Sequence, residues 1–226
     1  MGLSSRYELV IFDWDGTLMN SVERIVASVQ YAASSCGLPV LSFDTSKQII
    51  GLSLERAIAQ LYPQIESSLV DAMAQAYTQH FLQDCDVAMQ PYEGAMLLLD
   101  KLREQGVKRA VATGKSRRGL DAVLAQTGWV EYFNCTRTPV ESASKPNPLM
   151  LEQILAELNV DVSRALMVGD TTFDMEMAQA INMDRVALSH GVHSLEQMRP
   201  YQKHLLLVIR LLSPYLILMI YAWHFH

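Results

Sequence analysis

The chain of 226 residues is long enough for one α/β domain with a smaller inserted unit. Its net charge of −6 at pH 7 lacks the basic excess typical of nucleic-acid-binding proteins, so nucleic acid is not an expected partner. The three cysteines show no metal-binding or redox spacing, and the first residues carry no apolar signal segment, so we expect a cytoplasmic protein.

The first apolar segment, residues 9–12, has the length of a buried strand and is followed by Asp13 and Asp15. Gly16 then permits a sharp turn. Side chains two positions apart on an extended chain point the same way, so both carboxylates are expected to face one pocket. A bound cation or a shared proton would relieve their repulsion. The alternative is a polar turn without a chemical role.

Three segments with the apolar spacing of helices follow, at residues 21–36, 46–61 and 65–82. A direct crossover between neighbouring parallel strands needs only one helix, so three in succession predict an inserted helical cap. We place this cap at residues 20–87, between two parts of an α/β core at residues 1–19 and 88–204. The alternative is that these helices cover one face of the sheet.

Strands and helices alternate from residue 91 onward. Strands are expected at residues 108–112, 132–136, 165–169 and 185–188, and helices at 92–105, 117–126, 149–158 and 173–181. This alternation predicts a doubly wound parallel sheet, which binds its ligands beyond the carboxyl ends of the strands.

Polar residues follow the predicted strands or lie in the loops beside them: Asp13 with Asp15, Thr113 with Gly114, Lys145, and Asp170 with Asp174. Taken singly, each is explained as a turn residue, a helix cap or a solvated charge. Taken together, the carboxylates would form an oxygen-lined site suited to Mg²⁺, and Lys145 would add positive charge. Thr113 and nearby amides would supply directed donors. Such a set matches phosphoryl transfer, in which an aspartate can be the nucleophile.

These residues stand in segments that resemble the four motifs of the haloacid dehalogenase superfamily: Asp13-Trp14-Asp15-Gly16-Thr17-Leu18, Thr113-Gly114, Lys145-Pro146 and Gly169-Asp170-Thr171-Thr172-Phe173-Asp174. The resemblance covers residues 8–194. Within the superfamily, the chain is similar to the phosphoglycolate phosphatase branch with a small helical cap. The resemblance implies a Rossmann-like core, Mg²⁺ as cofactor and a small phosphorylated metabolite as substrate.

The resemblance also implies catalytic roles. Asp13 would attack phosphorus and form an aspartyl-phosphate. Asp15 would protonate the leaving oxygen and later activate water, since a group that gives a proton in one half-reaction can recover one in the next. Thr113 and Gly114 would hold the phosphoryl oxygens, while Lys145 would offset the charge of Asp13 and phosphate.

The implied Mg²⁺ ligands are Asp13, the backbone carbonyl of Asp15, and Asp170, with Asp174 behind them. Dehalogenases of the superfamily lack the second aspartate of the first motif, so Asp15 argues against carbon–halogen hydrolysis. A sugar-phosphate mutase, a pyrophosphatase and a non-catalytic regulatory protein that retains the fold are the alternatives.

Substrate choice is left open by the sequence. Four basic residues, Lys47, Arg56, Arg117 and Arg118, are candidates for contacting an anionic leaving group, with solvated surface as the alternative. Phosphoglycolate, a sugar phosphate, a nucleotide and pyrophosphate all stay open. Asn182 replaces the glycine usual in the family after the last-motif helix, and asparagine is the next best residue for a left-handed helix end.

Residues 205–226 form an atypical apolar tail. It is interpreted as a last buried strand with a segment packed on the core, as an altered terminus, or as a membrane segment. Membrane contact is the least favoured of the three, because residues 205–223 barely span a bilayer and Arg210 near the middle costs roughly 2.5 to 3.5 kcal/mol to insert.

Overall fold

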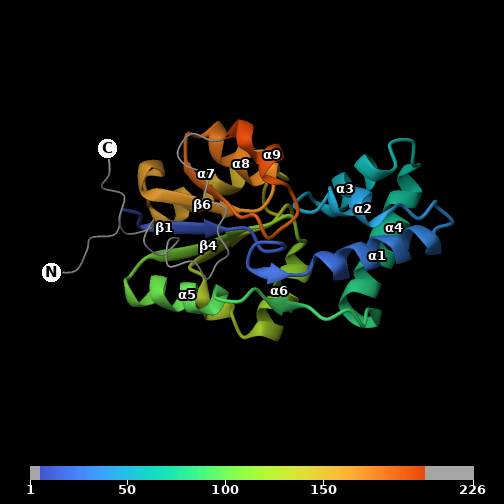
Figure 1. Cartoon of the computed structure of the whole chain (residues 1–226), viewed down its shortest axis with the longest axis horizontal. Helices are drawn as coiled ribbons and strands as arrows, with labels where there is room; N and C mark the ends of the chain where they lie inside the picture. The colour runs from blue at the N-terminus through green and yellow to red at the C-terminus, as the bar shows by residue number, and fades with distance from the viewer. Residues whose placement is uncertain (1–5, 202–226) are drawn as a thin grey trace.

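The computed structural model describes residues 6–201 (Figure 1). Its main sheet has five parallel strands in the order β5-β4-β1-β6-β7. In chain order they are β1 (Leu9–Phe12), β4 (Lys108–Ala112), β5 (Cys135–Arg137), β6 (Ala165–Gly169) and β7 (Asp184–Ala187). The predicted α/β class is therefore confirmed, and the first strand is the central one.

Helices cover both faces of the sheet (Figure 1): α5 (Ala95–Glu104), α6 (Arg117–Thr127), α7 (Leu149–Leu158) and α8 (Thr172–Ala180). Val10 and Phe12 of β1 belong to the apolar core that includes α5 and α6. Leu9 and Ile11 belong to the core that includes α7 and α8. Because both faces are covered, a central parallel strand is apolar at every position, and all four residues are fully buried.

A helical insertion leaves the core between two short antiparallel strands, β2 (Met19–Asn20) and β3 (Gln90–Pro91). It contains α1 (Val22–Ser35), α2 (Phe43–Lys47), α3 (Leu54–Leu61), α4 (Ser67–Gln79) and a π-helix, η1 (His80–Asp84). In Figure 1 the insertion lies beyond the carboxyl end of β1, the edge at which the sequence places the site.

The single helix expected at residues 46–61 is wrong. Helix α2 ends at Lys47 and α3 begins at Leu54. Gly51 has a φ of +103°, which a helix does not allow, and Ser53 is extended immediately before α3. Residues 48–53 instead form a loop, called the insertion loop below, that contacts the core.

Smaller differences concern element boundaries. The strand expected at residues 132–136 begins only at Cys135, because a 3-10 turn, η2 (Val130–Tyr132), follows α6. The helix expected at residues 92–105 begins at Ala95, after Gly94 with a φ of +86°. Asn182 has a φ of +56°, which confirms the left-handed helix end expected there.

The remaining short elements are η3 (Val162–Arg164), α9 (Leu195–Met198) and η4 (Arg199–Tyr201). Within residues 6–201, no helix combines the length and the apolar character needed to cross a bilayer. The apolar tail at residues 205–226 lies outside the described residues, so its three interpretations stay open.

Candidate active site

A buried cluster of charges forms beyond the ends of β1 and β6. Lys145 Nζ lies 2.8 Å from Asp13 Oδ1 and 2.6 Å from Asp174 Oδ1, and the three side chains are at most 1% exposed. Burial alone would lower the pKa of Lys145, but the two carboxylates outweigh it and raise the pKa. Lys145 is therefore held as a cation between two acids from distant parts of the chain, and the alternative of a solvated loop charge is wrong.

Asp170 completes the cluster at the end of β6. Its carboxylate accepts hydrogen bonds from Thr17 Oγ1 at 2.7 Å and from the backbone amide of Val192 at 2.8 Å. A Cβ atom at Gly16 would lie 2.2 Å from Asp170 Oδ2, so only glycine fits against this carboxylate. These contacts fix Asp170 within the site.

Asp174 is held by its own helix end. Thr171 Oγ1 donates a hydrogen bond of 2.7 Å to Asp174 Oδ2, and the Thr171 amide donates one of 3.1 Å to the same oxygen. The Asp174 amide in turn bonds to Thr171 Oγ1, so the pair forms a capping box at the start of α8. The capping interaction turns the other carboxylate oxygen toward Lys145.

The cluster has the composition of a divalent cation site. Oxygen atoms of Asp13, Asp170 and Asp174 lie within 4.8 Å of one another, and Lys145 balances only one of the three charges. Apart from Lys145, none of the described residues donates a hydrogen bond to the carboxylate of Asp13. Burial raises the pKa of Asp13 to about 7 in spite of Lys145, and the neighbouring carboxylates add to the rise. Two uncompensated charges on oxygen ligands fit Mg²⁺.

Asp15 belongs to a second polar cluster. Its carboxylate accepts a 2.6 Å hydrogen bond from Ser21 Oγ and forms an ion pair of 2.9 Å with Lys115 Nζ. The Lys115 ammonium also lies 4.4 Å from the centre of the Phe81 ring, which belongs to the insertion. The expectation that Asp13 and Asp15 point the same way as strand neighbours needs correction, because β1 ends before both and each carboxylate contacts its own lysine. The two acids are still close enough for the charge of Asp15 to help raise the pKa of Asp13.

Thr113 and Gly114 follow β4, the strand that pairs with β1. Thr113 is buried, and its Oγ1 accepts a 3.2 Å hydrogen bond from the Lys115 amide. A Cβ atom at Gly114 would lie 2.4 Å from the carbonyl oxygen of Leu52 in the insertion loop. Gly114 therefore allows the insertion to contact the core beside the site, and phosphoryl binding by both residues stays a prediction.

The aspartates are held partly by residues that the sequence analysis did not single out: Thr17, Ser21, Lys115 and the amide of Val192. For most of them, no spacing rule predicts a contact with an acid so distant in sequence. Lys115 gave a usable signal, because a cation just before the start of α6 is unfavourable next to the helix dipole and calls for an acidic partner.

Three of the four basic candidates contact the protein itself, and two of these, Lys47 and Arg56, belong to the insertion. Lys47 Nζ pairs with Asp44 at 2.7 Å within α2. Arg56 Nη1 donates to the carbonyl oxygen of Lys145 at 3.1 Å. Arg56 therefore links α3 to the loop that carries the site lysine.

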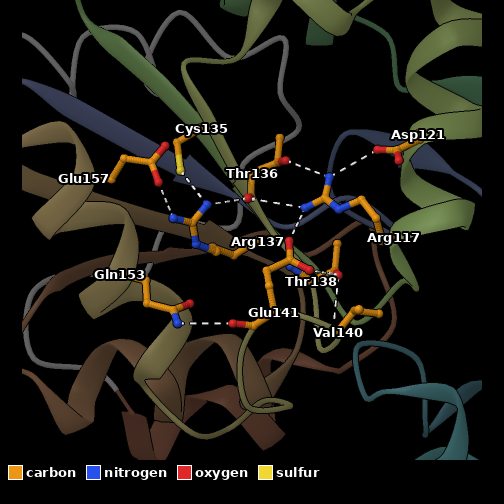
Figure 2. Close-up of polar contacts among 10 residues, drawn as sticks. All are labelled: Arg117, Asp121, Cys135, Thr136, Arg137, Thr138, Val140, Glu141, Gln153 and Glu157. Atoms are coloured by element: carbon orange, nitrogen blue, oxygen red, sulfur yellow. Dashed lines mark hydrogen bonds and ion pairs between the residues drawn. The ribbon is translucent and has the colours of Figure 1, made fainter.

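Arg117 belongs to the polar network that Figure 2 shows beside β5. It pairs with Glu141 and, at 3.1 Å, with Asp121. Glu141 accepts hydrogen bonds from the amide and hydroxyl of Thr138, and its carbonyl oxygen accepts one of 3.2 Å from Gln153. The network fixes residues 138–141, just before Lys145, so Arg117 supports the site from outside.

The fold and the clusters define an α/β enzyme with a carboxylate-rich centre at the ends of its strands. Residues 10–188 match the family model of haloacid dehalogenase-like hydrolases, and the chain belongs to this family. The family and the enzyme class expected from the sequence are thus confirmed.

Relatives of the chain include phosphatases. It is 31% identical over 196 residues to "Probable phosphatase IndB" of Dickeya dadantii (strain 3937), covering 84% of this chain and 85% of the relative. It is 25% identical over 188 residues to the phosphoglycolate phosphatase of Agrobacterium fabrum, covering 81% of each. A solved haloacid dehalogenase-like family hydrolase from Streptococcus pneumoniae has the same fold, with a TM-score of 0.79 at 20% identity over 95% of this chain and 98% of that one.

Proposed function

We propose that this protein is a Mg²⁺-dependent phosphatase that hydrolyses a small phosphorylated metabolite through an aspartyl-phosphate intermediate. The observation that carries the proposal is the carboxylate of Asp13, which is buried and has Lys145 as its only polar partner among the described residues. Such a carboxylate keeps lone pairs available to an electrophile.

In the first half-reaction a carboxylate oxygen of Asp13 forms a bond to phosphorus, and the bond from phosphorus to the alcohol oxygen breaks. Asp15 gives its proton to that oxygen. In the second half-reaction Asp15 takes a proton from a water molecule, whose oxygen attacks phosphorus and releases Asp13 and phosphate. Lys145, between Asp13 and Asp174, offsets the negative charge that the phosphoryl group brings.

Asp13, the Asp15 carbonyl and Asp170 would hold Mg²⁺, with Asp174 behind them, and the bound cation would supply positive charge to the phosphoryl oxygens. Removing divalent cations with excess chelator is expected to reduce hydrolysis of an aryl phosphate to background, and added Mg²⁺ to restore it. Mg²⁺ is also expected to raise the melting temperature, because it compensates two buried charges. Phosphate-release assays and thermal unfolding measure both effects. Full activity in chelator would refute the proposed cofactor, and transfer of phosphate to a second substrate molecule instead of water would indicate a mutase.

Gly114→Ala is expected to lower kcat/KM by about 10- to 100-fold with little change in melting temperature. The added Cβ would displace the insertion loop at Leu52, so the insertion could no longer close against the core. Gly119→Ala is the matched control, because it adds the same methyl group to the wall of the same cavity between core and insertion but meets only the Ser116 hydroxyl, at 3.2 Å, and not the insertion loop. Equal kcat/KM in both variants would contradict a role for the contact.

A further inference from the structure

Two cavities adjoin each other between the core and the insertion. The inner cavity has a volume of about 80 Å³ and has Asp15 and Lys115 in its wall. The outer groove has a volume of about 810 Å³. Four residues line both: Leu54, Thr78, Gly114 and Ser116. An alcohol that leaves from phosphorus beside Asp15 would therefore occupy the inner cavity first and extend into the outer groove.

The inner cavity offers a substrate mainly apolar surface. Ile25 and Val29 of α1, Leu52 of the insertion loop and Ala57 of α3 contribute to its wall. The ammonium of Lys115 is the only cationic group that the described residues place there, and it already contacts Asp15 at 2.9 Å. A second anionic group on the substrate would have to share this one cation with Asp15.

The outer groove is weakly acidic and rich in neutral hydrogen-bonding groups. The charged side chains that the described residues contribute are Glu55, Asp71 and Arg118, two acids against one base. Amides from α4 and η1 add neutral donors and acceptors: Gln75, Gln79 and Gln83. These groups suit hydroxyl or amide groups of a substrate better than a carboxylate.

The other basic candidates do not supply the missing charge. Lys47, Arg56 and Arg117 line neither cavity, and each is engaged with a partner elsewhere. Only Arg118 of the four faces the groove, and Glu55 and Asp71 outnumber it there.

Building on the proposed phosphatase function, we propose that the substrate is a phosphomonoester of an uncharged alcohol. Its part next to the ester oxygen is apolar and fits the inner cavity, and its hydrogen-bonding groups lie further out in the groove. The same cavities disfavour an ester whose alcohol carries a carboxylate close to phosphorus, of which phosphoglycolate is the smallest example.

A matched pair of esters tests this inference. Ethylene glycol monophosphate has the chain length of phosphoglycolate but carries a hydroxymethyl group in place of the carboxylate. With Mg²⁺ present, its kcat/KM is expected to be at least about tenfold higher, because like charges in a binding site select against the wrong partner. Each ester is also tested as a competitive inhibitor of aryl phosphate hydrolysis. The two inhibition constants then compare the affinities of the esters even if one of them is hydrolysed slowly.

A charge-neutralised groove provides the second arm. The double variant Glu55→Gln with Asp71→Asn is expected to raise the ratio of kcat/KM for phosphoglycolate to kcat/KM for the neutral ester about two- to fivefold, a modest effect because both acids are exposed. Glu66→Gln with Asp86→Asn removes the same charge from the insertion outside both cavities and is expected to leave this ratio as it is in the wild type.

The outcomes separate the inference from the proposed function. The inference is supported if kcat/KM is higher for the neutral ester than for phosphoglycolate and if this difference is smaller in the double variant Glu55→Gln with Asp71→Asn. Equal use of both esters, or a preference for phosphoglycolate, overturns it while leaving the phosphatase intact. Failure to hydrolyse the aryl phosphate and both esters overturns the proposed function, and the inference with it.

Discussion

Asp13→Asn is expected to abolish phosphate release, with a loss of at least ~10⁴-fold in kcat, because an amide cannot form the aspartyl-phosphate. The substitution keeps the shape of the side chain and its place beside Lys145. Steady-state assays on an aryl phosphate, with and without Mg²⁺, measure the effect. A variant that kept substantial turnover would show that the nucleophile lies elsewhere.

The same substitution is expected to stabilise the metal-free protein at alkaline pH. Burial raises the pKa of Asp13 from an ordinary 3.8 to about 7, so the folded state binds this proton more tightly than the unfolded state does. The resulting stability is complete below pH 4 and is lost as the pH rises through 7. Asparagine has no proton to lose, so melting temperatures in chelator should fall less between pH 5 and 8 in the variant than in the wild type.

Glu8→Gln is the matched control for both measurements. Glu8 stands at the opposite end of β1, where its side chain is 54% exposed and pairs with Arg164. Its neutralisation is expected to leave activity unchanged and to shift the melting temperature equally at both pH values. A wild-type protein in chelator whose stability did not fall between pH 5 and 8 would contradict the raised pKa of Asp13.

The central part of the site could be predicted because it depends on strand ends. Parallel strands end at the same edge of a sheet, so acids that follow β1 and β6 had to meet. Asp13 and Asp174 now bracket Lys145, although 29 residues separate Lys145 from Asp174 and many more separate it from Asp13. The apolar run before Asp13 was sufficient to predict a buried strand, which the structure places at the centre of the sheet.

The contacts around Asp15 could not be predicted in the same way, since they depend on how the insertion sits on the core. In the segment taken for one helix, Ile49 and Ile50 of the insertion loop and Ile58 of α3 are all buried, so apolar residues of a loop and of a helix together imitate the pattern of a single helix. The positive φ of Gly51 marks the turn in the structure. Glycine can adopt positive or negative φ, and the sequence does not show which of the two a given glycine adopts. The contact between this loop and Gly114 could not be predicted from the sequence for the same reason.

Lys145→Met is expected to destabilise the metal-free protein by about 3 to 5 kcal/mol at pH 8 and to abolish activity. The side chain is fully buried and pairs with Asp13 and Asp174, so its removal leaves buried carboxylates without a cation. The pKa of Asp13 would then rise further above its unfolded value, so the loss of stability should shrink as the pH falls to 5 and this carboxylate takes up a proton.

Mg²⁺ distinguishes this charge effect from simple loss of packing. If the deficit is electrostatic, Mg²⁺ should restore much of the stability of Lys145→Met and should add more to it than to the wild type, because three carboxylates then lack any other counter-charge. Lys101→Met on α5, remote from the site, is expected to behave like the wild type. Chemical denaturation in chelator and in Mg²⁺ at pH 5 and 8 measures these free energies of unfolding. A deficit that is independent of both pH and Mg²⁺ would mean that Lys145 acts only by filling space, and the charge balance argued for this site would be wrong.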